Sequence, residues 1–152
     1  MGVDFYVAVP AGEWPTAVAV EQCASREGYP IKVGRFPSLD AKKVVTEGAT
    51  VSVDGRDAYL EGELSPASLS GEEVRAINER LDISASTFRI NDQHVLMSFR
   101  VRSPDEMRAA SYVIASLVVC FGGYGFEPQG NTHGRADFAK SLIDGAALLK
   151  EP

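Results

Sequence analysis

The sequence predicts a single α+β domain, residues 1–152, built on a mainly antiparallel sheet. Two observations predict the sheet: the dipeptides Asp54-Gly55 and Asn91-Asp92 each separate two segments in which apolar residues alternate with polar ones. A third observation predicts the helices, because apolar residues recur at helical spacing in four other segments. A chain of 152 residues is long enough to bury one core.

The first part of the chain predicts a strand, a helix and a second strand. Residues 4–9 are rich in β-branched and aromatic side chains, which favours a buried strand. Pro15 suits the first turn of a helix that runs to about Glu27, and Gly28 provides a left-handed stop. Residues 31–36 alternate and indicate the second strand.

The first hairpin is predicted around Asp54-Gly55, which suits a type I′ turn because both central residues of that turn have positive φ. A two-residue loop pairs residues 50–53 with 56–60. One face then carries the apolar side chains Val51, Val53, Ala58 and Leu60. The opposite face carries Ser52, Asp57, Tyr59 and Glu61.

A second hairpin is predicted around Asn91-Asp92, joining residues 87–90 to 93–101. Alternation places one set of side chains on the core face: Phe88, Ile90, Val95, Met97, Phe99 and Val101. It places another set on the opposite face: Arg89, His94, Leu96, Ser98, Arg100 and Arg102.

Between the hairpins, a helix is predicted to begin at a capping box. Ser70 and Glu73 have the spacing at which each side chain reaches the other residue's backbone N–H. Val74, Ile77 and Leu81 follow as an apolar stripe.

Two further helices are predicted after the second hairpin. Ser103 followed by Pro104 opens a helix that is apolar nearly all round as far as Phe121, so we expect it at the centre of the fold. The last helix runs from about Arg135 to Leu149. Its expected buried residues are Phe138, Leu142, Ile143, Ala146 and Leu149.

The predicted element order is β-α-β-β, then β-α-β-β again, then two helices. This order resembles that of ferredoxin-like and double split-βαβ domains, and some bacterial small-molecule-binding domains related to gyrase inhibitors share it. The resemblance covers residues 4–102, concerns element order alone and implies no site residues. We expect the helices chiefly on one face of the sheet.

Charge and composition limit the classes of partner that the protein is expected to bind and the compartment in which it is expected to occur. Asp and Glu number 21 against 15 Lys and Arg, a net charge of −6 that disfavours binding to nucleic acid. The apolar run 109–121 is too short to cross a bilayer, so no membrane association is expected. The N-terminus lacks the pattern of a secretory signal. We expect Cys23 and Cys120 to be free, buried thiols in a cytoplasmic protein.

The first candidate site is the loop 122–135, which contains five glycines. Glycines let a backbone approach a ligand closely, and loops on a rigid scaffold often carry function. The candidate ligand-binding residues are Tyr124, Glu127, Asn131, His133 and Arg135. Asn131 or Thr132 is expected to cap the last helix, whose N-terminus favours an anion. Alternatively, the glycines only permit tight turns while His133 and Arg135 hold the loop to the body.

The second candidate site is the outward face of the sheet. Tyr59, Glu61 and Glu63 belong to one hairpin, and carboxylates beside a tyrosine suit a cationic ligand. The other hairpin contributes basic or titratable residues: Arg89, His94, Arg100 and Arg102. The alternative is that these acidic and basic residues pair across neighbouring strands.

These features favour a non-catalytic cytoplasmic module that recognises a small molecule or a protein through the loop and the open sheet face. No nucleophile motif, metal-ligand spacing or cofactor fingerprint occurs in the sequence, so no catalytic residue, metal or cofactor is predicted. A homodimer is compatible with the sequence. One alternative is an acidic partner protein of the immunity or inhibitor type, which would mask a basic enzyme. Another is a small hydrolase or isomerase that uses Glu127 and His133 as acid–base groups.

Overall fold

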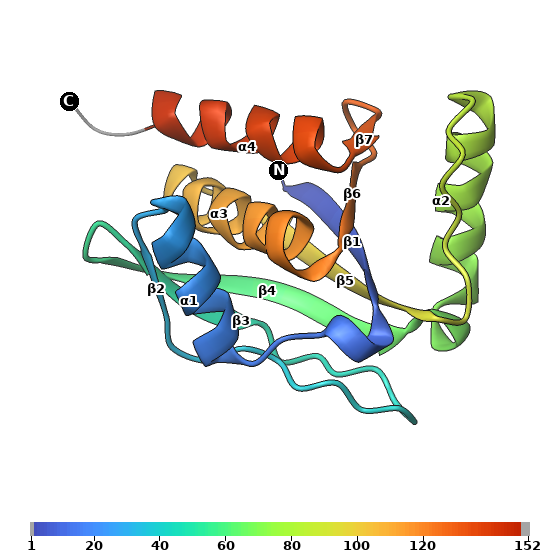
Figure 1. Cartoon of the computed structure of the whole chain (residues 1–152), viewed down its shortest axis with the longest axis horizontal. Coiled ribbons are helices and arrows are strands. Elements are labelled where there is room, and N and C mark those ends of the chain that lie inside the picture. Colours follow the sequence, from blue (N-terminus) through green and yellow to red (C-terminus); the bar gives the residue numbers. More distant parts are fainter. Residues whose placement is uncertain (1, 150–152) are drawn as a thin grey trace.

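The computed structural model describes residues 2–149, which form an α+β fold with a seven-stranded antiparallel sheet and four α-helices (Figure 1). The strands are β1 (Val3–Pro10), β2 (Ile31–Val33), β3 (Ala49–Val53), β4 (Arg56–Pro66), β5 (His94–Val101), β6 (Tyr124–Glu127) and β7 (Thr132–Gly134). The helices are α1 (Ala17–Glu27), α2 (Gly71–Ile83), α3 (Pro104–Phe121) and α4 (Ala136–Leu148), with short 3₁₀ turns at Ala11–Glu13 and Ala67–Leu69. The strand order is β2-β3-β4-β5-β1-β6-β7.

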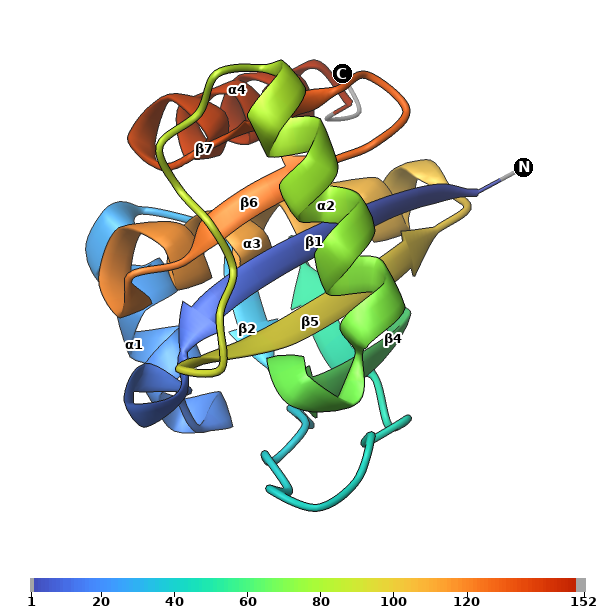
Figure 2. The ribbon, with the colours of Figure 1, turned by 90° about the vertical axis from the view of Figure 1, so that its right-hand side faces the viewer.

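Helices lie on both faces of the sheet. The inner face is covered by α1 and α3, and α4 packs on α3 (Figure 1). The outer face is partly covered by α2, which lies across the strands in Figure 2. As predicted, α3 is at the centre of the fold, because Val113 and Leu117 have no exposed surface. The expectation that helices cover chiefly one face is therefore correct for three helices and wrong for α2.

The first hairpin is confirmed. Asp54 and Gly55 have φ values of 51° and 80°, as a type I′ turn requires. Val53 pairs with Arg56 and Val51 with Ala58. The predicted inward residues of β3 and β4 belong to the main core.

The second hairpin is wrong. Residues 87–93 form no strand, and β5 pairs instead with β1 and β4, which occupy both of its edges. Val95 and its alternate neighbours face the inner core as predicted. Phe88 and Ile90 lie on the opposite side, where they pack with Leu96 in a second cluster.

The element order therefore departs from two β-α-β-β units after α2. The chain continues as β5-α3-β6-β7-α4, and the predicted loop 122–135 contains two strands. The strand predicted at 31–36 ends at Val33, and one isolated bridge, between Val45 and Leu64, lies in the connection to β3.

The helix starts follow the predictions in one case out of four. Helix α1 begins after Thr16, whose hydroxyl accepts a hydrogen bond from the Ala19 N–H at 3.2 Å, so Pro15 precedes the helix and does not lie in its first turn. The Ser103 hydroxyl accepts a hydrogen bond from the Glu106 N–H at 3.2 Å, as predicted. The Ser70 hydroxyl does not cap α2, because it bonds to the Ser65 hydroxyl at 2.5 Å. The first residue of α4 follows Arg135, which provides no side-chain cap, so neither Asn131 nor Thr132 caps this helix.

Two further corrections concern the helices. Leu149, expected to be buried, is exposed. Cys23 of α1 and Cys120 of α3 are joined in a disulfide, so the expectation of free thiols is wrong. Among residues 2–149, no helix combines the length and the apolar content that crossing a bilayer requires.

Candidate functional site

The glycine-rich segment 122–135 is an edge hairpin packed onto the body. Tyr6 to Ala8 of β1 pair with β6, and β6 pairs with β7. Gly125 is needed for packing, because a Cβ there would lie 2.3 Å from the Phe138 ring of α4. A Cβ added at Gly123 would likewise lie too close to Val7 and Leu117. These glycines bring the hairpin against the core and do not face an open cavity.

Three of the five loop candidates form one interlocked cluster. The Tyr124 hydroxyl shares hydrogen bonds with His133 Nδ1 at 2.7 Å and with Ser86 Oγ at 3.1 Å. The Tyr124 ring stacks on Phe88, with centroids 4.1 Å apart. The Arg135 guanidinium lies over both rings and donates to the Gly122 carbonyl at 3.0 Å. These side chains hold the loop to the body, which was the alternative interpretation of the sequence.

The other two loop candidates lie at the turn. The Glu127 carboxylate accepts a hydrogen bond from the Gly130 N–H. Asn131 has a φ of 52°, a left-handed conformation that asparagine tolerates in turns. His133 pairs with Phe126, so Glu127 and His133 alternate onto opposite faces of the hairpin. The structure does not bring the proposed acid–base pair together.

The outer face of the sheet has a covered half and an open half. In the covered half, α2 and the segment that follows it bury an apolar cluster against the ends of the strands (Figure 2). Its buried members are Ala8, Ala67, Ile77, Leu81, Ile90, Leu96 and Phe126. The open half carries polar side chains from β1, β3, β4 and β5, including the predicted residues Tyr59, Glu61 and Glu63.

A groove crosses the open half beside the first turn of α2. It consists of two adjoining hollows of 270 and 140 Å³ that share Tyr6, Glu63 and Ser98. We call it the Tyr6 groove. Its charged lining is Asp4, Glu61, Glu63, Glu73 and Arg100. Four carboxylates and one guanidinium therefore surround a half-buried phenol.

The charges of the Tyr6 groove are only partly neutralised. Arg100 donates two hydrogen bonds to Asp4, each 3.0 Å long, and Glu61 pairs with Arg102. Within residues 2–149, no hydrogen bond or ion pair engages the carboxylate of Glu63 or Glu73. Burial raises the pKa of the Tyr6 phenol, and the carboxylates of Asp4, Glu73 and Glu63 add to this effect while Arg100 opposes it.

A second hollow, of 580 Å³, lies on the same face toward the β2 edge. We call it the Tyr59 hollow; Tyr59, Lys32, Asp57 and Ser52 line it. Tyr59 is 51% exposed, and its hydroxyl accepts a hydrogen bond from the Gly48 N–H at 3.3 Å. The phenol is thus held by its hydroxyl while about half of the residue's surface stays exposed.

Two predicted members of the open face lie elsewhere. Arg89 is in the segment after α2, where it pairs with Asp82. His94 lies on the outer face but at the covered end, edge-on to Phe88.

Three residues of the Tyr6 groove were not predicted from the sequence: Asp4, Tyr6 and Glu73. For Asp4 and Tyr6 a signal existed, because they alternate with Phe5 and Val7 in the first predicted strand and must share its outer face. Glu73 reaches the groove from a helix, and no local pattern predicts that approach.

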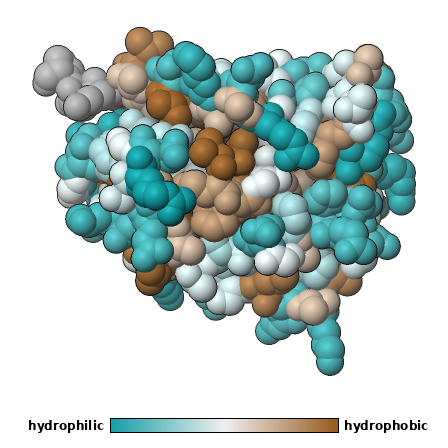
Figure 3. Space-filling view, in the orientation of Figure 1, coloured by the Kyte–Doolittle hydropathy of each residue, from teal (hydrophilic) through white to brown (hydrophobic). Residues whose placement is uncertain are grey.

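Two further hollows lie away from the Tyr6 groove: one of 530 Å³ with Trp14 and Phe36 in its lining, and one of 390 Å³ with Tyr29 and Asp54 in its lining. The side of the molecule seen in Figure 3 is mostly hydrophilic, with one hydrophobic area near its middle and smaller ones toward its edges. In the described part of the chain, no three histidine, cysteine or carboxylate side chains are grouped to hold a metal.

Comparisons with known proteins identify no relative. The chain matches no protein-family model, no curated protein and no solved structure.

Proposed function

We propose that the protein is a non-catalytic binding protein whose ligand surface is the open half of the outer sheet face. The ligand presents a positively charged group, an ammonium or a guanidinium, to the Tyr6 groove. The observation that carries this proposal is the pair of unengaged carboxylates, Glu63 and Glu73, which line the groove together with Tyr6. A cation there gains two carboxylate partners and the face of an aromatic ring.

The position of the Tyr59 hollow favours a basic protein segment over a small free amine. Tyr59 and Glu61 are successive outward residues of β4, roughly 7 Å apart at strand spacing, so the hollow and the groove adjoin. A ligand that fills both is larger than a single amine. An exposed tyrosine beside a charged groove is also typical of the residues that contribute most to protein interfaces. This agrees with the acidic partner protein considered from the sequence.

Titration with Nα-acetylated arginine amide, followed by amide NMR shifts, tests the cation site. We expect shifts at Tyr6, Glu63 and Glu73, and no such shifts with Nα-acetylated citrulline amide, which carries no charge; both probes are acetylated throughout. Glu63→Gln and Glu73→Gln should each weaken binding about two- to fivefold, the range for an exposed ion pair worth up to ~1 kcal/mol.

Glu72→Gln is the matched control, because it removes the same charge from the same helix turn outside the groove. Equal shifts with citrulline amide, or an equal loss in Glu72→Gln, would contradict the proposal. Tyr59→Ala should weaken the binding of an arginine-containing peptide and leave the binding of arginine amide unchanged.

The disulfide bears on the compartment. Disulfides persist in oxidising compartments and are rare in the cytoplasm, so the Cys23–Cys120 bond supports an oxidising location instead of the expected cytoplasmic one. Blocking free thiols at the moment of cell lysis, followed by mass analysis, would show whether the bond exists in the source cell.

A further inference from the structure

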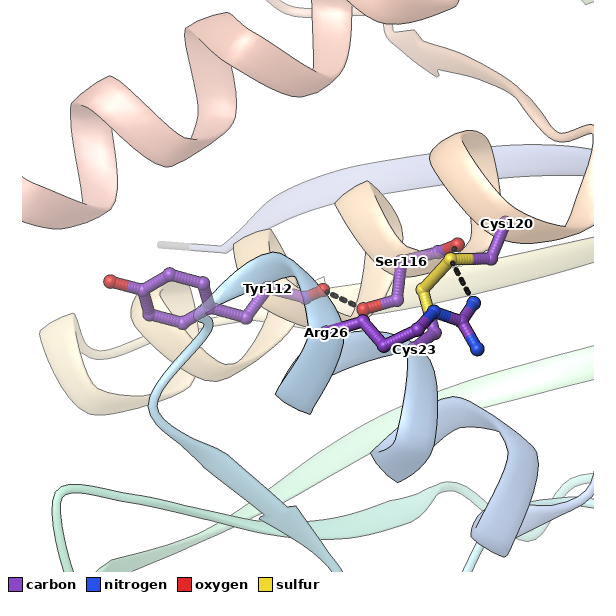
Figure 4. Close-up of a disulfide and its surroundings, with 5 residues drawn as sticks. All are labelled: Cys23, Arg26, Tyr112, Ser116 and Cys120. Atoms are coloured by element: carbon purple, nitrogen blue, oxygen red, sulfur yellow. Dashed lines mark hydrogen bonds between the residues drawn. A yellow bond between two sulfur atoms is a disulfide. The ribbon is translucent and has the colours of Figure 1, made fainter.

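The disulfide joins two helices on the inner side of the sheet and has one accessible end. Cys23 of α1 is completely buried, whereas Cys120, in the last turn of α3, is partly exposed (Figure 4). Cys23 Sγ lies 3.6 Å from the Ser116 carbonyl oxygen, inside the contact between the helices. A thiolate from solvent can therefore approach the Cys120 sulfur but not the Cys23 sulfur.

A positive charge stands beside the accessible sulfur. Arg26 follows Cys23 by three residues on α1, and its Nη2 lies 3.5 Å from Cys120 Sγ. The Arg26 side chain is exposed, so it also faces an approaching solute. Because thiol–disulfide exchange proceeds through an anionic thiolate, this guanidinium attracts the nucleophile and stabilises the negative charge of the transition state.

The bond has structural consequences beyond the two cysteines. The buried residues of α1 are Val20, Cys23 and Ala24, so one of its three buried residues is covalently bonded to α3. On the other side of α1, the Glu21 carboxylate accepts a hydrogen bond of 2.7 Å from the Val33 N–H. Val33 belongs to the edge strand β2, so α1 occupies a donor that an open sheet edge would otherwise expose.

We propose that Cys120 is a thiol-exchange site for anionic low-molecular-weight thiols, the class that includes glutathione. The incoming thiolate attacks Cys120 Sγ and forms a mixed disulfide there. The bond to Cys23 breaks, its electron pair leaves with the Cys23 sulfur, and that sulfur takes a proton from solvent. A second thiolate attacks the small-molecule sulfur of this mixed disulfide; the Cys120 sulfur leaves with the electron pair and takes a proton, and the two small thiols depart joined as their own disulfide. The exchange releases α1 from α3 and loosens the hold of Glu21 on Val33.

The test compares two thiols on the intact protein at equal thiolate concentration: anionic 2-mercaptoethanesulfonate and cationic cysteamine. We expect the anionic thiol to react faster. Arg26→Gln should slow it about fivefold, the factor for two unit charges roughly 4 Å apart in water, and should remove its advantage. Arg75→Gln, which removes an exposed charge from α2, is the matched control and should change neither rate.

Two measurements locate the reaction and its effect. Peptide mapping of the trapped intermediate should find the adduct on Cys120 with Cys23 free. Hydrogen exchange of the Val33 amide should accelerate in the reduced protein and change little at Val51, on the neighbouring strand. An adduct on Cys23, or equal rates for both thiols, would overturn the exchange site. Unchanged exchange at Val33 would overturn the release of α1.

Discussion

The inner and outer faces of the sheet use the same strands in different ways. Within residues 2–149, the inner face contributes to a core cluster of twenty-five buried residues, and the outer face contributes to one of seven. The inner cluster is closed by α1, α3 and α4, whereas the outer cluster ends at the Tyr6 groove. The difference indicates that stability resides mainly on the inner face, which leaves the open half of the outer face free for recognition.

The largest effect should come from neighbouring residues of β5 that point to opposite faces. Met97 has no exposed surface in the inner cluster, and Leu96 is 4% exposed in the outer one. We expect Met97→Ala to lower the free energy of unfolding by about 4 kcal/mol, because the surrounding helices and strands cannot close the cavity. Leu96→Ala should lower it by about 2 kcal/mol, since it lies beside an open groove where the structure can relax. Urea unfolding of both variants measures the difference. Equal losses of unfolding free energy in the two variants would show that the two faces contribute equally to stability.

A second prediction concerns the buried charge on the inner side. Arg108 of α3 is 6% exposed, its Nη2 lies 2.9 Å from Asp54 Oδ2, and its Nε has no hydrogen-bond partner in the described part of the chain. Asp54→Asn should reduce the stability by about 2 kcal/mol, because it leaves a buried guanidinium without its counter-charge. Asparagine also tolerates positive φ, so the turn is kept.

Asp57→Asn is the control for this charge loss, because Asp57 is an exposed outward residue of β4. It should change the stability by less than about 0.5 kcal/mol. A similar loss in both variants would mean that the Arg108 pair contributes nothing particular to the inner face.

The features that could be predicted from the sequence are those that depend on residues close together along the chain. The Asp54-Gly55 hairpin was correct because turn chemistry and alternation over ten residues agree. The hairpin at Asn91-Asp92 shows the same kind of signal but failed, because distant strands β1 and β4 occupy both edges of β5. Strand β6 was missed because Gly125 weakens its strand signal, and the reason for that glycine is a ring thirteen residues away, Phe138.

The residues of the candidate site likewise divide into those that a local pattern predicts and those that only the tertiary fold brings in. Tyr59, Glu61 and Glu63 were placed on the outer face by the register of one hairpin. The other residues of the Tyr6 groove come from β1, β5 and α2, and only the tertiary fold brings them together. The disulfide is the extreme case, because its cysteines are 97 residues apart in sequence.

The smallest expected effect is a pH dependence at the covered end of the outer face. Burial lowers the pKa of His94 from its ordinary value of 6.5. A hydrogen bond with the Asn91 backbone opposes this shift, and the positive charge of Arg135 adds to it. Between the lowered pKa and 6.5, the unfolded chain binds the proton more tightly than the folded one. The contribution of His94 to stability is therefore complete above pH 6.5 and declines as the pH falls through the folded-state pKa.

Thermal unfolding between pH 7.5 and 5 measures this contribution, with His94→Gln as the variant that should flatten the profile. His133→Gln removes the other histidine, at the edge hairpin, and serves as the comparison. A wild-type profile that His94→Gln leaves unchanged would assign the pH dependence to other groups. A profile flattened by His94→Gln alone would show that the covered half of the outer face, and not the inner core, is the part of the sheet that responds to protons.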